Sequence, residues 1–174
     1  MIRRIDLGIC AAYEYENDGP TAVALPGAML GGMPALWWAI SPLHASGWRV
    51  VLVWDEFVDR SQDHRQWGRE RLEAAGQADL VVGKSLGCYA ATVDLPAVLL
   101  TPALNDADFV AALRRRTAQT LLVGGTADPM WDGPTARQLG DVLELDGADH
   151  GLARIDQAQR VADAVAEFSG RARP

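Results

Sequence analysis

Short apolar runs alternate with helix-compatible segments along most of the chain. Buried strands are predicted at residues 21–25, 49–54, 80–82, 97–100, 120–123 and 142–145. Helices are predicted at residues 31–46, 61–75, 86–93, 106–116 and 134–139, and an amphipathic helix at 152–168 with Ile155, Val161, Val165 and Phe168 facing inward. This alternation predicts an α/β fold: a mainly parallel sheet between two helix layers, a three-layer α/β/α sandwich.

The first residues follow a different pattern. Apolar and polar positions roughly alternate over residues 2–16 and end at the turn signal 17–20, which predicts one strand or a hairpin. The stretch 19–48 contains no Asp, Glu, Lys or Arg, but repeated Pro and Gly residues argue against a membrane span. No long apolar core precedes Asp6, so we expect no signal peptide and a cytoplasmic protein.

Composition narrows the class of protein further. The chain has 174 residues, of which 49% are hydrophobic and 22% charged, and we expect a single domain spanning residues 1–174. A net charge of −7 without a basic stripe argues against a nucleic-acid partner. The two cysteines do not form a disulfide framework, and Cys88 is expected to be a small buried thiol.

The segment Gly83-Lys84-Ser85-Leu86-Gly87 has the G-x-S-x-G spacing of a nucleophile elbow. A strand leads into it and a short helix follows, so Ser85 is predicted on a tight turn at the end of the sheet, where both glycines avoid clashes. The Gly-Lys-Ser triplet also resembles the end of a phosphate-binding loop, but that loop needs glycine where Ala78 stands. Lys84 is the only lysine; a role in the chemistry stays open, but we favour a compositional accident.

A serine nucleophile needs a base and a group that orients the base. Of the three histidines, His44 and His64 fall within predicted helices, whereas His150 follows the last strand. Asp128 follows the strand before that, so the chain order Ser85, Asp128, His150 matches a catalytic triad. Asp132 is the alternative acid.

An oxyanion hole requires two backbone N–H groups. Leu86, directly after the serine, is predicted to supply one, and Ala28 or alternatively Met29 the other. Met29, Met130 and Trp131 flank strand ends and are candidate substrate-binding residues. The chemistry of a Ser–His–Asp triad requires no metal or cofactor.

At these motifs the chain resembles the α/β-hydrolase family over nearly its whole length. The resemblance rests on the segments Gly83–Gly87, Gly124–Pro129 and Asp149–Leu152, and is greatest to small capless members similar to dienelactone-hydrolase-like proteins. It implies the α/β-hydrolase fold and a serine esterase or related hydrolase. The family often has His-Gly where this chain has Pro26-Gly27, and only one helix fits between the strands at 97–100 and 120–123. The resemblance therefore implies an open site without a cap domain, suited to small or exposed acyl groups.

The residues leave three hypotheses open. The first is a hydrolase acting on a small-molecule ester or thioester through an acyl-enzyme at Ser85. The second is an acyltransferase that uses the same triad. The third is a non-catalytic binding or regulatory protein on the same fold. The sequence does not indicate an oligomeric state.

Overall fold

An eight-stranded sheet forms the centre of the molecule in the computed structural model, which describes residues 1–28, 33–55 and 62–173. The strands are β1 (Ile2–Asp6), β2 (Ala11–Tyr15), β3 (Thr21–Leu25), β4 (Arg49–Trp54), β5 (Leu80–Lys84), β6 (Ala97–Leu100), β7 (Thr120–Gly125) and β8 (Asp141–Leu145). The helices are α1 (Met33–Ala45), α2 (His64–Ala75), the 3₁₀-helix η2 (Ser85–Thr92), α3 (Ala107–Arg114), α4 (Gly133–Leu139) and α5 (Ile155–Arg171).

The strands are arranged in the order β1-β2-β4-β3-β5-β6-β7-β8. β1 and β2 form an antiparallel hairpin, and β2 pairs antiparallel with β4, whereas all the other pairs are parallel. The prediction of a mainly parallel α/β sheet is confirmed, and residues 2–16 form the hairpin. In a parallel sheet the carboxyl ends of the strands share one edge, where ligands bind in folds of this kind.

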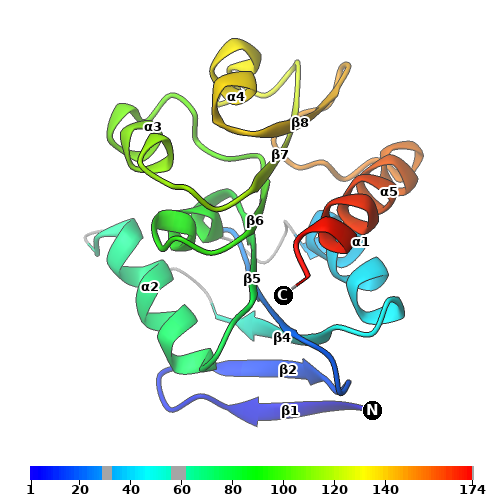
Figure 1. Cartoon of the computed structure of the whole chain (residues 1–174). Coiled ribbons are helices and arrows are strands. Elements are labelled where there is room, and N and C mark those ends of the chain that lie inside the picture. Colours follow the sequence, from blue (N-terminus) through cyan, green and yellow to red (C-terminus); the bar gives the residue numbers. More distant parts are fainter. Residues whose placement is uncertain (29–32, 56–61, 174) are drawn as a thin grey trace.

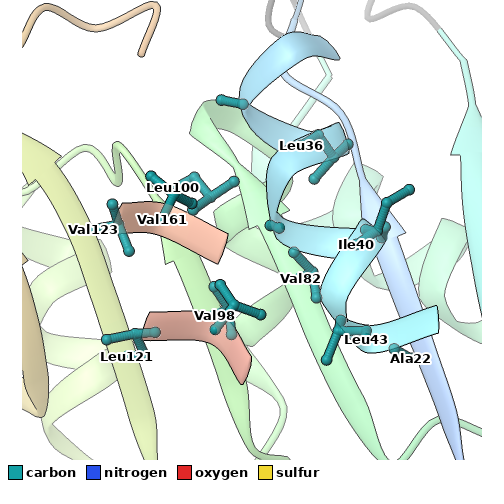
Figure 2. Packing of buried hydrophobic residues seen from close by; sticks show 14 of the residues in the cluster. Ala22, Leu36, Ile40, Leu43, Val82, Val98, Leu100, Leu121, Val123 and Val161 are labelled. Atoms are coloured by element: carbon teal, nitrogen blue, oxygen red, sulfur yellow. The ribbon is translucent and has the colours of Figure 1, made fainter. Parts of the chain in front are cut away.

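Helices cover both faces of the sheet (Figure 1). Figure 1 shows α1 and α5 on one side and α2 and α3 on the other. On the first side, Leu36, Ile40 and Leu43 of α1 pack on strand residues such as Val82 and Val98 (Figure 2). On the second side, a separate core joins α2, η2, α3 and α4 to the sheet. The molecule is thus the predicted three-layer sandwich.

Some predicted element boundaries shift. α5 begins at Ile155, whose side chain is 82% exposed, so the prediction that Ile155 faces inward is wrong. Ile155 lies in the first turn of α5, before the part of the helix that packs on the sheet. Val161, Val165 and Phe168 are buried as predicted. The helix after the elbow is a 3₁₀-helix, and the start predicted for α2 at Ser61 lies outside the described residues.

Between β6 and β7 the chain forms a single helix, α3. Asp106 caps it, and its carboxylate accepts hydrogen bonds from the backbone N–H groups of Asp108 and Phe109. This connection therefore adds no cap over the carboxyl edge of the sheet. None of the helices in the described segments is long and apolar enough to cross a lipid bilayer.

Candidate active site

Ser85 lies on a strained turn between β5 and η2. Its φ angle is +52°, a conformation that is uncommon for a residue other than glycine and is often found at functional sites. A Cβ atom on Gly83 would come within 2.6 Å of the Cys88 backbone, and one on Gly87 would overlap the Leu25 carbonyl oxygen. Both glycines of the motif are therefore required by the tight packing of this turn.

The structure brings Ser85, His150 and Asp128 into one hydrogen-bonded chain. The Ser85 Oγ lies 2.8 Å from His150 Nε2, and His150 Nδ1 lies 2.8 Å from Asp128 Oδ2. The Asp128 side chain is fully buried, whereas that of His150 is 33% exposed. With a carboxylate beside Nδ1, that nitrogen carries the proton, which leaves Nε2 free to accept one from the serine hydroxyl.

Backbone contacts between two loops hold the acid beside the histidine. The N–H groups of Thr126 and Ala127 donate to the carbonyls of Leu145 and Ala148, at 3.1 and 3.0 Å. A Cβ on Gly125 would overlap the Ala148 carbonyl oxygen, so glycine allows this close approach. The Gly-Gly turn after β7 thus docks the loop that carries Asp128 onto the loop that carries His150.

Asp128 is also held from within its own loop, because its Oδ1 accepts the Met130 backbone N–H at 2.9 Å. Asp132, the alternative acid, instead precedes α4, where its carboxylate accepts the Thr135 hydroxyl. His44 lies at the end of α1 beside Asn17. Of the candidate acids and histidines, the geometry joins Asp128 and His150 to the serine.

A cavity of about 450 Å³ opens beside Ser85. Its lining consists of Ala28, His64, Ser85, Leu86, Tyr89, Ala103 and Met130. Both predicted oxyanion-hole residues, Ala28 and Leu86, therefore border the space next to the serine, as does the candidate substrate-binding residue Met130. Met29 lies outside the described residues.

Trp131, also predicted to bind substrate, is not among the described residues that line this cavity. Its ring packs on Gly124 of β7, and its Nε1–H donates to Glu144 of β8 at 2.8 Å. Because Gly124 has no side chain, the indole ring has room to pack directly against the sheet. A larger hollow of about 770 Å³ beside β7, β8 and α5 contains none of the predicted site residues.

Three lining residues were not predicted from the sequence as part of the site: His64, Tyr89 and Ala103. His64 begins α2 at the carboxyl edge, and its ring meets that of Tyr89 edge-on at 5.2 Å. The Tyr89 hydroxyl donates to Asp106 at 2.6 Å. The position of His64 shortly after β4 was the available signal, since the segments that follow parallel strands meet at this edge.

Two further titratable groups lie next to the serine. Burial raises the pKa of the Cys88 thiol to about 12, so it stays protonated and is a poor nucleophile near neutral pH. Lys84 is only 2% exposed, and burial lowers the pKa of its ammonium group. Within the described segments, no cluster of three or more His, Cys, Asp or Glu residues could hold a metal ion.

The fold resembles several solved structures at low sequence identity. A predicted CIB-like hydrolase from Thermoplasma acidophilum is 15% identical with a TM-score of 0.72, and Est1E from Butyrivibrio proteoclasticus is 12% identical with a TM-score of 0.73; each match covers 98% of both chains. XC6422 from Xanthomonas campestris, an α/β serine hydrolase without a lid, is 15% identical with a TM-score of 0.65, over 100% of this chain and 95% of the other. No protein-family model and no curated protein sequence matches the chain.

These similarities and the strand order define the fold class. The chain has the α/β-hydrolase fold, in a form with no cap between β6 and β7. At 12–15% identity the likeness establishes the fold and leaves the activity to be argued from the site.

Proposed function

We propose that this protein is a serine hydrolase that cleaves a small or exposed ester or thioester through an acyl-enzyme on Ser85. The observation that carries the proposal is the continuous chain from Ser85 Oγ through His150 to Asp128, with 2.8 Å at each step. A serine hydroxyl alone is a weak nucleophile, and this arrangement supplies the base and its orienting carboxylate.

In the first half of the reaction, Ser85 Oγ attacks the carbonyl carbon of the substrate while His150 Nε2 takes the hydroxyl proton. The tetrahedral intermediate collapses, and the imidazolium gives its proton to the departing alcohol or thiol. In the second half, His150 deprotonates a water molecule that attacks the acyl-enzyme, and the proton then returns to Ser85 as the acid is released. Asp128 stabilises the imidazolium in both halves.

The negative charge that develops on the substrate oxygen needs donors that are already in place. The N–H of Leu86, the first residue after the nucleophile, and the N–H of Ala28 are the proposed donors. Both residues border the cavity that contains Ser85. The packing of Gly87 on the Leu25 backbone supports this assignment, because it keeps the elbow and the loop after β3 together.

The lining of the cavity favours an uncharged acyl group. Leu86, Ala103 and Met130 give it apolar walls, and none of its described lining residues is an arginine, a lysine or a carboxylate. A charged acyl group would lose its hydration there and find no arginine, lysine or carboxylate among the described lining residues to pair with. Met130 is 38% exposed and lines the cavity, so its side chain is available to an acyl chain bound there.

A fluorophosphonate probe tests the proposal directly, because it reacts with activated serines. We expect labelling of Ser85, identified by peptide mass spectrometry, and hydrolysis of short p-nitrophenyl esters. Ser85→Ala should abolish both while keeping the circular-dichroism spectrum. Ser46→Ala is the matched control, since among the described residues that hydroxyl donates only to the Leu43 carbonyl at the end of α1. A folded wild-type protein that neither reacts with the probe nor hydrolyses any activated ester would contradict the proposal.

A further inference from the structure

Lys84, the residue before the nucleophile, is a buried cation that the triad chemistry does not use. It ends β5, it is 2% exposed, and it is the only lysine in the chain. Strand alternation places it on the same face as Val82, which packs in the core beneath α1 and α5. Burying a charged group is costly unless it is hydrogen-bonded, so its partners indicate what it does.

The Lys84 ammonium group joins two other segments of the catalytic edge. Its Nζ donates to the Thr101 hydroxyl at 2.6 Å and to the backbone carbonyl of His150 at 2.8 Å. Thr101 directly follows β6 and is fully buried, with a φ angle of +47°. One side chain therefore connects the ends of β5 and β6 with the loop between β8 and α5.

The hydrogen bond to the His150 carbonyl matters because, among the described residues, few other hydrogen bonds hold the main chain of His150. Neighbouring residues are tied within the loop: the Gly151 N–H donates to Asp149 Oδ1 and the Leu152 N–H to the Asp149 carbonyl. Among the described residues, Lys84 is the only one that donates to the His150 carbonyl. Ser85 and Asp128 hydrogen-bond the imidazole of His150, whereas Lys84 hydrogen-bonds its backbone carbonyl.

We infer that Lys84 is a positioning residue that fixes the backbone of His150 relative to Ser85, so that the imidazole reaches the serine hydroxyl and Asp128 together. The inference rests on the proposed function, because it concerns the base of that triad. Lys84 Nζ bonds to a threonine hydroxyl and a main-chain carbonyl, and to none of the reacting atoms. It acts through His150, and Thr101 acts through Lys84 by orienting the ammonium group.

Lys84→Met tests the inference, because methionine keeps an unbranched side chain and removes the charge and every N–H donor. We expect kcat for a short p-nitrophenyl ester to fall about 10- to 100-fold, because a small misplacement of a catalytic group has an effect of this size. KM should stay within about twofold, since Lys84 does not line the cavity. The downfield proton resonance of His150 Nδ1–H should shift or broaden, which reports on the geometry independently of turnover.

Thr101→Val provides a second route if Lys84→Met does not fold. Valine preserves the branched shape and removes the hydroxyl that orients Nζ, so a smaller loss of kcat and a shifted His150 resonance are expected. Because lysine occurs once, ε-¹³C-lysine labelling gives one signal, and it should move in this variant. The double variant should be no slower than Lys84→Met alone, since both residues act along one path.

Thr120→Val is the matched control, because it removes another buried threonine hydroxyl at the opposite, amino end of β7. It should leave kcat and the His150 resonance unchanged. The inference would be overturned by a wild-type kcat together with an unmoved His150 resonance in Lys84→Met. If Lys84→Met does not fold, the same result in Thr101→Val would overturn it. A wild-type protein that is inert toward probe and esters would instead overturn the proposed function, and the resonance alone would then decide the role of Lys84.

Discussion

Position 87 in the nucleophile elbow has no room for a side chain. A Cβ atom there would overlap the backbone carbonyl of Leu25 at the end of β3. Neither partner can move easily, because Leu25 is fully buried and its strand lies in the middle of the sheet. A substitution must therefore push η2 and the loop after β3 apart, and with them the two proposed oxyanion donors.

We predict that Gly87→Ala lowers the free energy of unfolding by about 1–3 kcal/mol, the usual cost of overpacking. It should also slow fluorophosphonate labelling of Ser85 by more than the loss of folded protein explains. Urea unfolding and labelling kinetics measure the two effects separately. Gly170→Ala is the control: a Cβ there meets no atom within 4 Å, and alanine should stabilise α5 by about 0.5–1 kcal/mol. Equal labelling rates in Gly87→Ala and wild type would contradict this account.

At the residue scale, the local pattern predicted the tight turn that carries Ser85, but it could not predict the surroundings of Lys84. The elbow spacing depends on residues within five positions of one another, so the sequence displays it directly. The interpretation of Lys84 as a compositional accident is not supported by the structure, because Nζ bonds the carbonyl of a residue 66 positions away. Only the fold brings such partners together.

At the scale of elements, the loop after β7 offers two carboxylates four residues apart, and the structure separates their roles. Asp128 directs its carboxylate to His150, whereas Asp132 precedes α4 and accepts the Thr135 hydroxyl. The backbone bonds from Thr126 and Ala127 to the β8–α5 connection decide which of the two reaches the histidine. Position along one short loop thus decides which carboxylate contacts the histidine and which contacts the first turn of α4.

We predict that Asp128→Asn lowers kcat by about three to four orders of magnitude, because an amide cannot stabilise the imidazolium and favours the wrong tautomer. Asp132→Asn should keep kcat near the wild-type value, since the Asp132 carboxylate contacts the Thr135 hydroxyl and not His150. Steady-state hydrolysis of p-nitrophenyl acetate by both variants, with thermal unfolding as the check of folding, measures the difference. The opposite ranking would identify Asp132 as the functional acid.

The element boundaries show where sequence patterns are reliable. β3, β4 and β6 coincide with the predicted ranges, because buried parallel strands are continuous apolar runs bounded by turns. Ile155 was misjudged because it is apolar, and the pattern does not say which surface an apolar residue meets. Ile155 lies in the exposed first turn of α5, and the Trp131 ring packs on Gly124.

At the scale of the whole molecule, alternation of strands and helices predicted the layers but not the order of the strands. β3 lies between β4 and β5, although β4 comes between them in sequence. This order depends on how the crossover helices pack on each face, which no local pattern records. It determines the site, because it places the end of β3 beside the elbow and leaves the N-terminal hairpin at the far side of β4.

That hairpin is held to the sheet by Glu14, whose carboxylate is 3% exposed and accepts Arg3 and Arg49 Nε–H groups at 2.6 Å each. The hydrogen bond from Arg3 is the largest cause that lowers the Glu14 pKa, against the opposing effect of burial. The folded protein therefore binds this proton less readily than the unfolded chain does. The stabilisation is complete above the unfolded-state pKa, near 4.5, and is lost as the pH falls through the lower folded-state value.

We predict that Glu14→Gln lowers the free energy of unfolding by about 1.5–3 kcal/mol at neutral pH, the usual contribution of hydrogen bonds to a charged group. The difference from wild type should shrink as the pH falls from 4.5 through the lower folded-state pKa, below which both states of the wild type are protonated. The kcat value should stay unchanged, because Arg49 begins β4 and the pair lies at the amino ends of the parallel strands, opposite Ser85. Urea unfolding between pH 3 and pH 8, in steps of about 0.5 pH units, measures this dependence of stability on pH. Glu73→Gln is the charge-matched control, because Glu73 is exposed on α2. A difference that persists unchanged at acid pH would mean that Glu14 stabilises the hairpin through packing and not through its charge.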